Sequence, residues 1–88
     1  MKLYLMAKVV ASREWYEEVL PMMEKKGFRD IPDKGFSDPE TDGELMGYFF
    51  EYNGKELPLQ DFVEMINEIN KIMDEGETMR PTWTIVGD

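Results

Sequence analysis

Apolar residues along this chain alternate between the spacing of a β-strand and that of an α-helix, and the order of these changes limits the possible folds. The alternate residues from Leu3 to Ala11 are all apolar, which is typical of a strand with one buried face. Residues 45–52, LMGYFFEY, are the clearest strand, and TWTIV after Pro81 is the last. FRDIP, residues 28–32, is predicted to form a short strand. Pro32 ends this strand because proline has no N–H to continue the hydrogen-bond ladder.

Two segments between these strands have helical spacing. Ser12 is a good N-cap for the first, and Gly27 is suited to end it. Its apolar stripe contains either Trp15, Val19, Met22 and Met23 or Tyr16, Leu20 and Met23. Pro21 removes a hydrogen bond inside this segment, which predicts a kink or a break into two short helices.

The second helix is expected to begin at Pro58, where Leu57 can pack on Phe62, and to end at Gly76. Its predicted apolar stripe is Phe62, Ile66, Ile69 and Met73. The order strand, helix, strand, strand, helix, strand predicts one α+β domain over residues 1–88. The expected architecture is a ferredoxin-like two-layer sandwich (βαββαβ), an antiparallel sheet with two helices on one face.

The residue inventory excludes most familiar catalytic chemistry. The chain contains no cysteine and no histidine, which removes disulfides, thiolate nucleophiles and the commonest general base and transition-metal ligand. No catalytic residue and no cofactor are therefore predicted. The apolar N-terminus is too short to cross a bilayer and is interrupted by Lys8, so we expect a soluble cytoplasmic protein with no membrane association.

Residues 38–45, DPETDGEL, match the first half of an EF-hand calcium loop. Asp38, Glu40 and Asp42 occupy the first, third and fifth positions, and a glycine follows at the sixth. The twelfth position, which requires a bidentate glutamate, is Phe49. An acidic turn between two strands explains the same residues, and no metal site is predicted.

Charge is distributed unevenly along the chain. Residues 1–29 carry six basic and four acidic side chains, whereas residues 30–88 carry four basic and fifteen acidic ones, giving net charges of +2 and −11. This field repels nucleic acid and attracts basic protein surfaces. The expected partner is a protein with a basic surface, with no direct nucleic-acid binding. The predicted partner-binding acids are Asp33, Asp38, Glu40, Asp42, Glu44, Glu64 and Glu68.

The predicted strands have more apolar residues than one sheet face can bury under helices. The face without helices is predicted to carry Tyr4, Met6, Val10, Leu45, Phe49 and Trp83. A face this apolar needs a cover. Either part of this face assignment is wrong, or the face has one of two covers: the long acidic loop of this chain, or an interface with a second copy or another partner.

Two functions follow from these features. The first is a non-enzymatic acidic domain that docks on a basic partner, in the manner of inhibitors, immunity proteins and nucleic-acid mimics. The second is a homodimer with a small-molecule pocket between sheet and helices, which is either a binding protein or an enzyme. The strand YLMAKVVA, a helix and the acidic turn DPETDGE resemble, in layout and without a diagnostic motif, dimeric antibiotic-biosynthesis monooxygenase-like domains. That resemblance implies pocket residues among Trp15, Tyr48, Asn67 and Arg80.

Overall fold

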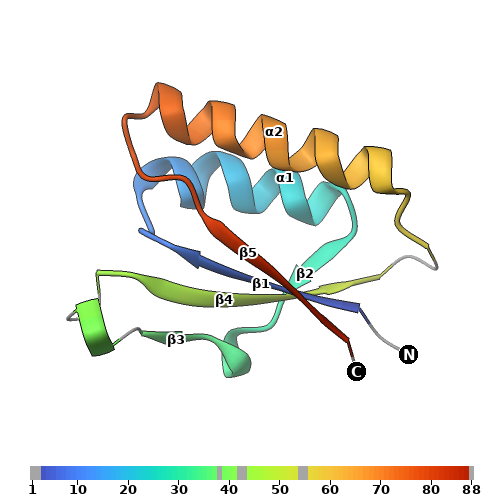
Figure 1. Ribbon diagram of the computed structural model, residues 1–88, viewed down its shortest axis with the longest axis horizontal. Coiled ribbons are helices and arrows are strands. Elements are labelled where there is room, and N and C mark those ends of the chain that lie inside the picture. Colours follow the sequence, from blue (N-terminus) through green and yellow to red (C-terminus); the bar gives the residue numbers. More distant parts are fainter. Residues whose placement is uncertain (1–2, 38, 42–43, 54–55, 88) are drawn as a thin grey trace.

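The computed structural model describes residues 3–37, 39–41, 44–53 and 56–87. Within these residues, five strands form one antiparallel sheet, and two helical segments cover one of its faces (Figure 1). The strands are β1 (Leu3–Val9), β2 (Phe28–Asp30), β3 (Phe36–Ser37), β4 (Met46–Tyr52) and β5 (Thr82–Gly87). The α+β class predicted from the sequence is confirmed.

The sheet has the strand order β2-β4-β1-β5, with β3 also paired to β4. Because β1 occupies one side of β4, β2 and β3 lie in succession along its other side. Asp30 lies opposite Phe50, and Phe36 lies opposite Gly47, so six steps along this edge match three steps along β4. The three extra residues form a bulge that contains the 3₁₀ turn η2 (Pro32–Lys34).

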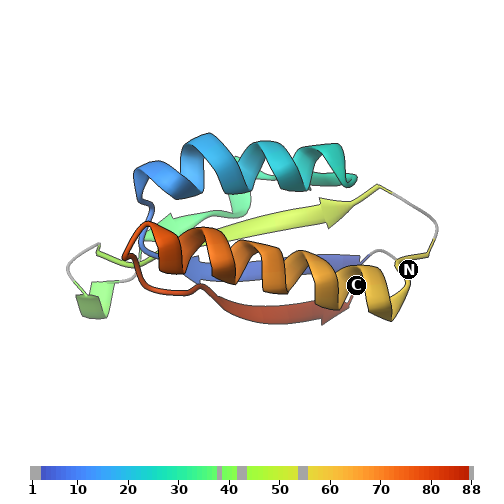
Figure 2. The same cartoon turned by 90° about the horizontal axis from the view of Figure 1, so that it is seen from above.

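The first helical run changes its hydrogen-bond pattern at Pro21. Its first part is a π-helix, η1 (Trp15–Val19), in which the Leu20 N–H donates to the Trp15 carbonyl. The second part is an α-helix, α1 (Leu20–Lys25), with the proline in its first turn, where the missing N–H costs least. Figure 2 shows one unbroken run, so the conflict predicted at Pro21 is met by a π-to-α change.

The second helix, α2 (Leu59–Glu75), begins after Pro58 and ends before Gly76, as predicted. Gly76 does not have a left-handed backbone; instead, a Cβ there would overlap the side chain of Glu14. The buried stripe of α2 is Met65, Ile69 and Met73. Phe62 and Ile66, which were predicted to belong to this stripe, are half-buried beside it. The helix is therefore rotated slightly from the orientation that the sequence pattern predicts.

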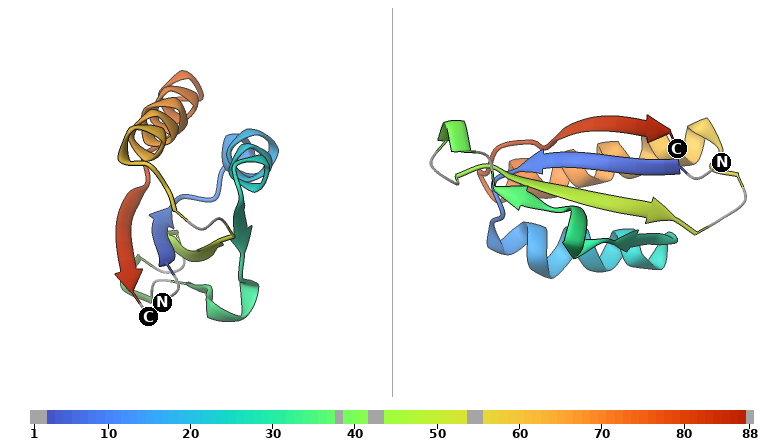
Figure 3. Two further views of the ribbon diagram at one scale, coloured as in Figure 1. Left: turned by 90° about the vertical axis from the view of Figure 1, so that its right-hand side faces the viewer. Right: turned by 90° about the horizontal axis from the view of Figure 1, so that it is seen from below.

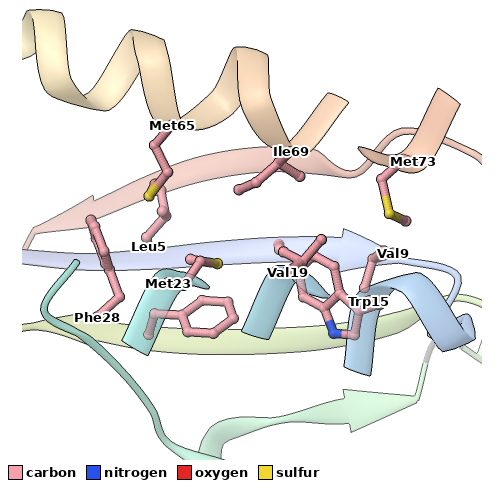
Figure 4. Packing of buried hydrophobic residues seen from close by; sticks show 11 residues of the cluster. Leu5, Val9, Trp15, Val19, Met23, Phe28, Met65, Ile69 and Met73 are labelled. Atoms are coloured by element: carbon pink, nitrogen blue, oxygen red, sulfur yellow. The ribbon is translucent and has the colours of Figure 1, made fainter. Parts of the chain in front are cut away.

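The hydrophobic core lies between the helices and the sheet (Figure 4). Its members are Leu5, Ala7, Val9, Trp15, Val19, Met23, Phe28, Phe50, Met65, Ile69 and Met73. Trp15 is fully buried, and its ring centroid is 5.3 Å from that of Tyr48 and 6.2 Å from that of Trp83. These contacts connect the first helical run to both β4 and β5.

Ile69→Ala should lower the free energy of unfolding by about 2–5 kcal/mol, because it leaves a cavity at a fully buried position. Lys71→Ala shortens an exposed side chain of the same helix and should change stability by less than about 0.5 kcal/mol. Urea denaturation measures both. Equal losses for the two variants would contradict the orientation of α2.

Candidate functional site

The predicted acidic residues lie on two sides of the molecule. Glu64 and Glu68 lie on α2, above the sheet in Figure 1, whereas Asp33 lies in η2 and Glu40 in η3 (Pro39–Thr41), beside β3 below it. Glu44 is exposed just after η3. Asp38 and Asp42 lie outside the described residues. The structure therefore separates the predicted acids into an α2 group and a loop group.

The acids of α2 lie on the side of the helix that faces the first helical run. Glu68 Oε2 is 4.0 Å from Lys26 Nζ, and Asp61 and Glu64 line a hollow of about 260 Å³ together with Lys26. The three carboxylates are spaced three and four residues apart, which places them in a row along one side of the helix. We call Asp61, Glu64 and Glu68 the acidic flank of α2.

The sheet face without helices carries part of the predicted apolar interface. Tyr4, Met6 and Phe49 lie on this face, with Met6 directly opposite Phe49, and all three are half-buried. Val10 follows the end of β1, and Leu45 precedes the start of β4. These two residues therefore lie at the border of the face.

The predicted position of Trp83 on this open face is wrong. Trp83 lies opposite the buried Ala7, and its ring packs against Trp15 and Phe50 on the helix side. The alternation of β5 fixes which residues share a face with Trp83, but only its pairing with β1 decides which face that is. Thr84 lies opposite Met6 and Val86 lies opposite Tyr4, so Thr84 and Val86 form the open-face side of β5.

Part of the acidic loop covers the open face, which is one of the two covers expected from the sequence. The ring of Phe36 lies where a Cβ of Gly47 would be, so only glycine fits at that position. Lys34 Nζ lies 4.4 Å from the ring centroid of Tyr4, within the range of a cation–π contact. The bulge after β2 and the short strand β3 therefore place Lys34 and Phe36 over the sheet.

The same bulge opens a hollow of about 380 Å³ at the sheet edge. Its lining residues are Asp30, Pro32, Gly35, Phe36, Ser37, Met46, Gly47 and Tyr48. The Tyr48 hydroxyl donates a hydrogen bond of 3.1 Å to the Tyr16 hydroxyl. Burial, followed by the contact with Tyr16, raises the pKa of Tyr48 well above its usual value, so the phenol stays a neutral donor.

Of the pocket residues implied by the resemblance, the structure brings only Tyr48 to this hollow. Trp15 is buried in the core, and its Nε1 has no hydrogen-bond partner among the described residues. Asn67 is exposed on α2, and Arg80 forms hydrogen bonds of 3.0 and 2.7 Å to Asp74. Asp30 also lines this hollow. Sequence reasoning missed Asp30 because its position in the hollow depends on the bulge that follows it.

No metal-binding cluster of three or more histidine, cysteine, aspartate or glutamate residues occurs in the described part of the chain. Two of the three acids in the calcium-like motif, Asp38 and Asp42, lie outside that part. Among the helices of the described residues, none is long and apolar enough to cross a membrane.

Comparison with protein-family models found no matching family, and searches of curated proteins and of solved structures found no match either.

Asp30→Asn should stabilise the fold at neutral pH and lose this advantage near pH 3. Burial raises the pKa of Asp30 above its unfolded value, so the folded state binds the proton more tightly and ionisation costs stability. This cost is present at pH values above the pKa of Asp30 in the folded state. It disappears as the pH falls through the pKa that Asp30 has in the unfolded state. Urea midpoints at both pH values measure it. Asp33→Asn, which removes the same charge from η2, is the control, and an equal effect would contradict the prediction.

Proposed function

We propose that this chain is a non-enzymatic protein-binding domain that docks on a basic surface of its partner through the acidic flank of α2. The observation that carries this proposal is the row of three exposed carboxylates, Asp61, Glu64 and Glu68, on one side of a 17-residue helix. A rigid helix holds these charges at fixed spacing, which favours recognition of a complementary cationic surface.

The charges of the acidic flank are only weakly compensated within the chain. Lys26 approaches Glu68 at 4.0 Å, and both side chains are about half exposed. A surface pair of this kind is worth about 0–1 kcal/mol because water and salt screen it. The field outside α2 therefore stays negative and can accelerate the approach of a basic protein.

The loop acids are a poorer docking surface than the acidic flank. A typical interface covers about 800 Å² of each partner, whereas this chain exposes 5883 Å² in total. One partner of ordinary size therefore cannot contact both sides of the sheet. Asp33, Glu40 and Glu44 lie on the loop side, where Lys34 and Arg29 also add positive charge.

Reversing the acidic flank should weaken binding far more than reversing the loop acids. Glu64→Lys/Glu68→Lys and Glu40→Lys/Glu44→Lys each change the net charge from −9 to −5, because each substitution adds two positive charges. With cytochrome c as a folded basic probe, we expect a loss of at least about tenfold for the first variant and less than about threefold for the second. Surface plasmon resonance at low and high salt measures both.

Equal losses for these two variants would mean that the probe responds to net charge alone, and the docking proposal would fail. Binding that does not weaken as salt is raised would contradict its electrostatic basis.

We also infer that the fold is of the ferredoxin-like kind, with β3 as an addition. The strand order β2-β4-β1-β5, the antiparallel pairing and the position of both helices on one face support this inference.

A second candidate function is the binding of a small neutral molecule in the hollow beside Tyr48. Its volume of about 380 Å³ lies within the usual range of ligand sites, and Tyr48, whose neutral hydroxyl is bonded to Tyr16, is one of its lining residues. With p-cresol as a probe, amide NMR signals of Gly47 and Tyr48 should shift, and Tyr48→Phe should weaken binding by about threefold or more. Shifts spread evenly over the chain would contradict this candidate.

A further inference from the structure

The two edges of the sheet differ in how they are protected from pairing with another chain. One edge is made of β2 and β3, which are three and two residues long and are separated by the bulge with Pro32. Short strands, bulges, proline and charged residues are the usual ways in which proteins block such an edge. Arg29 and Asp30 add the charges here.

The other edge, β5, has none of these protections. Its six residues, TWTIVG, contain no charge and no proline, and they pair without interruption along β1. Among the described residues, no further strand pairs with the outer side of β5. A long, uncharged, regular edge strand is a ready template for another strand.

The side of α2 that lies toward β5 carries no charge from Leu59 to Asn70, and Asp74 beyond them is paired with Arg80. Figure 3 shows α2 over the β5 side of the sheet and the first helical run over the β2 side. Leu59 is 76% exposed and Ile85 61% exposed, and both line an apolar hollow of about 150 Å³. Val63 follows Leu59 by one helical turn, and Asn67 and Asn70 continue the same side.

We propose that the outer edge of β5 pairs antiparallel with the β5 of a second copy of this chain, around a two-fold axis near Thr84 and Ile85. In this arrangement, Leu59, Val63 and Ile85 of each copy cover their equivalents in the other. The two sheets would become continuous, and each strand would supply the hydrogen-bond partners that the other lacks.

A second copy fits this surface because of where the charges lie. A two-fold contact brings the same surface patch of both copies together, so unpaired charges of one sign within that patch would repel each other. In a chain of net charge −9, β5 and the adjoining side of α2 form a region where that repulsion is absent. Asp74, on this side of α2, and Arg80 bind each other at 2.7 Å. The dimer does not rest on the proposed function, because the acidic flank of α2 faces the other way.

Sedimentation equilibrium of the intact chain tests the proposal. We expect twice the chain mass of 10.4 kDa, with little dependence on salt. Ile85→Lys and Ile85→Glu should each raise the dissociation constant by at least about tenfold, and mixing the two variants should restore a heterodimer. Ile85 is exposed in the single chain, so neither change should prevent folding.

Met6→Lys is the control, because Met6 lies on the open face of the neighbouring strand β1. A dimer that Met6→Lys dissociates while both Ile85 variants leave it intact would place the interface on the open face and overturn the proposal. A wild-type monomer at all concentrations up to about millimolar would also overturn it. Amide exchange on wild-type β5 supplies a test without substitutions: it should slow as concentration rises, and no change would again overturn the proposal.

Discussion

The burial of Trp15 is the interaction on which the rest of the structure depends. Its ring contacts Tyr48 and Phe50 on β4 and Trp83 on β5, so a single side chain fixes the first helical run across the sheet. Burying an aromatic of this size stabilises the fold by roughly 4–6 kcal/mol. Its Nε1, which has no hydrogen-bond partner among the described residues, costs about 1–3 kcal/mol. Packing therefore outweighs the unsatisfied polar atom.

Fixing the helices on one face of the sheet gives each part of the surface a different character. The acidic flank of α2 faces the groove toward the first helical run, while the opposite side of the same helix carries no charge from Leu59 to Asn70. The bulge at the β2–β3 edge covers part of the open face and creates the hollow beside Tyr48. Charge, apolar edge and hollow therefore occupy separate surfaces of one small domain.

The sequence predicted the elements of the fold better than it predicted the site. Residues 45–52 and 59–75 have strong local patterns, and both became the expected strand and helix. Trp83 was assigned to the wrong face because a period of two defines two faces without saying which one the helices cover. Asp30 and the hollow were missed because they depend on three extra residues in one strand, which no local pattern records.

By itself, the sequence determined the order of helices and strands, the two helix ends at Pro58 and Gly76, and the excess of acidic residues after position 29. These features depend on near neighbours in the chain: apolar spacing, proline geometry and composition. Only the tertiary structure decided which acids share a surface, which strand is left at an unprotected edge and where Phe36 lies over Gly47. Those outcomes depend on pairing between residues far apart in sequence, and such pairing is set by burial of the whole core around Trp15.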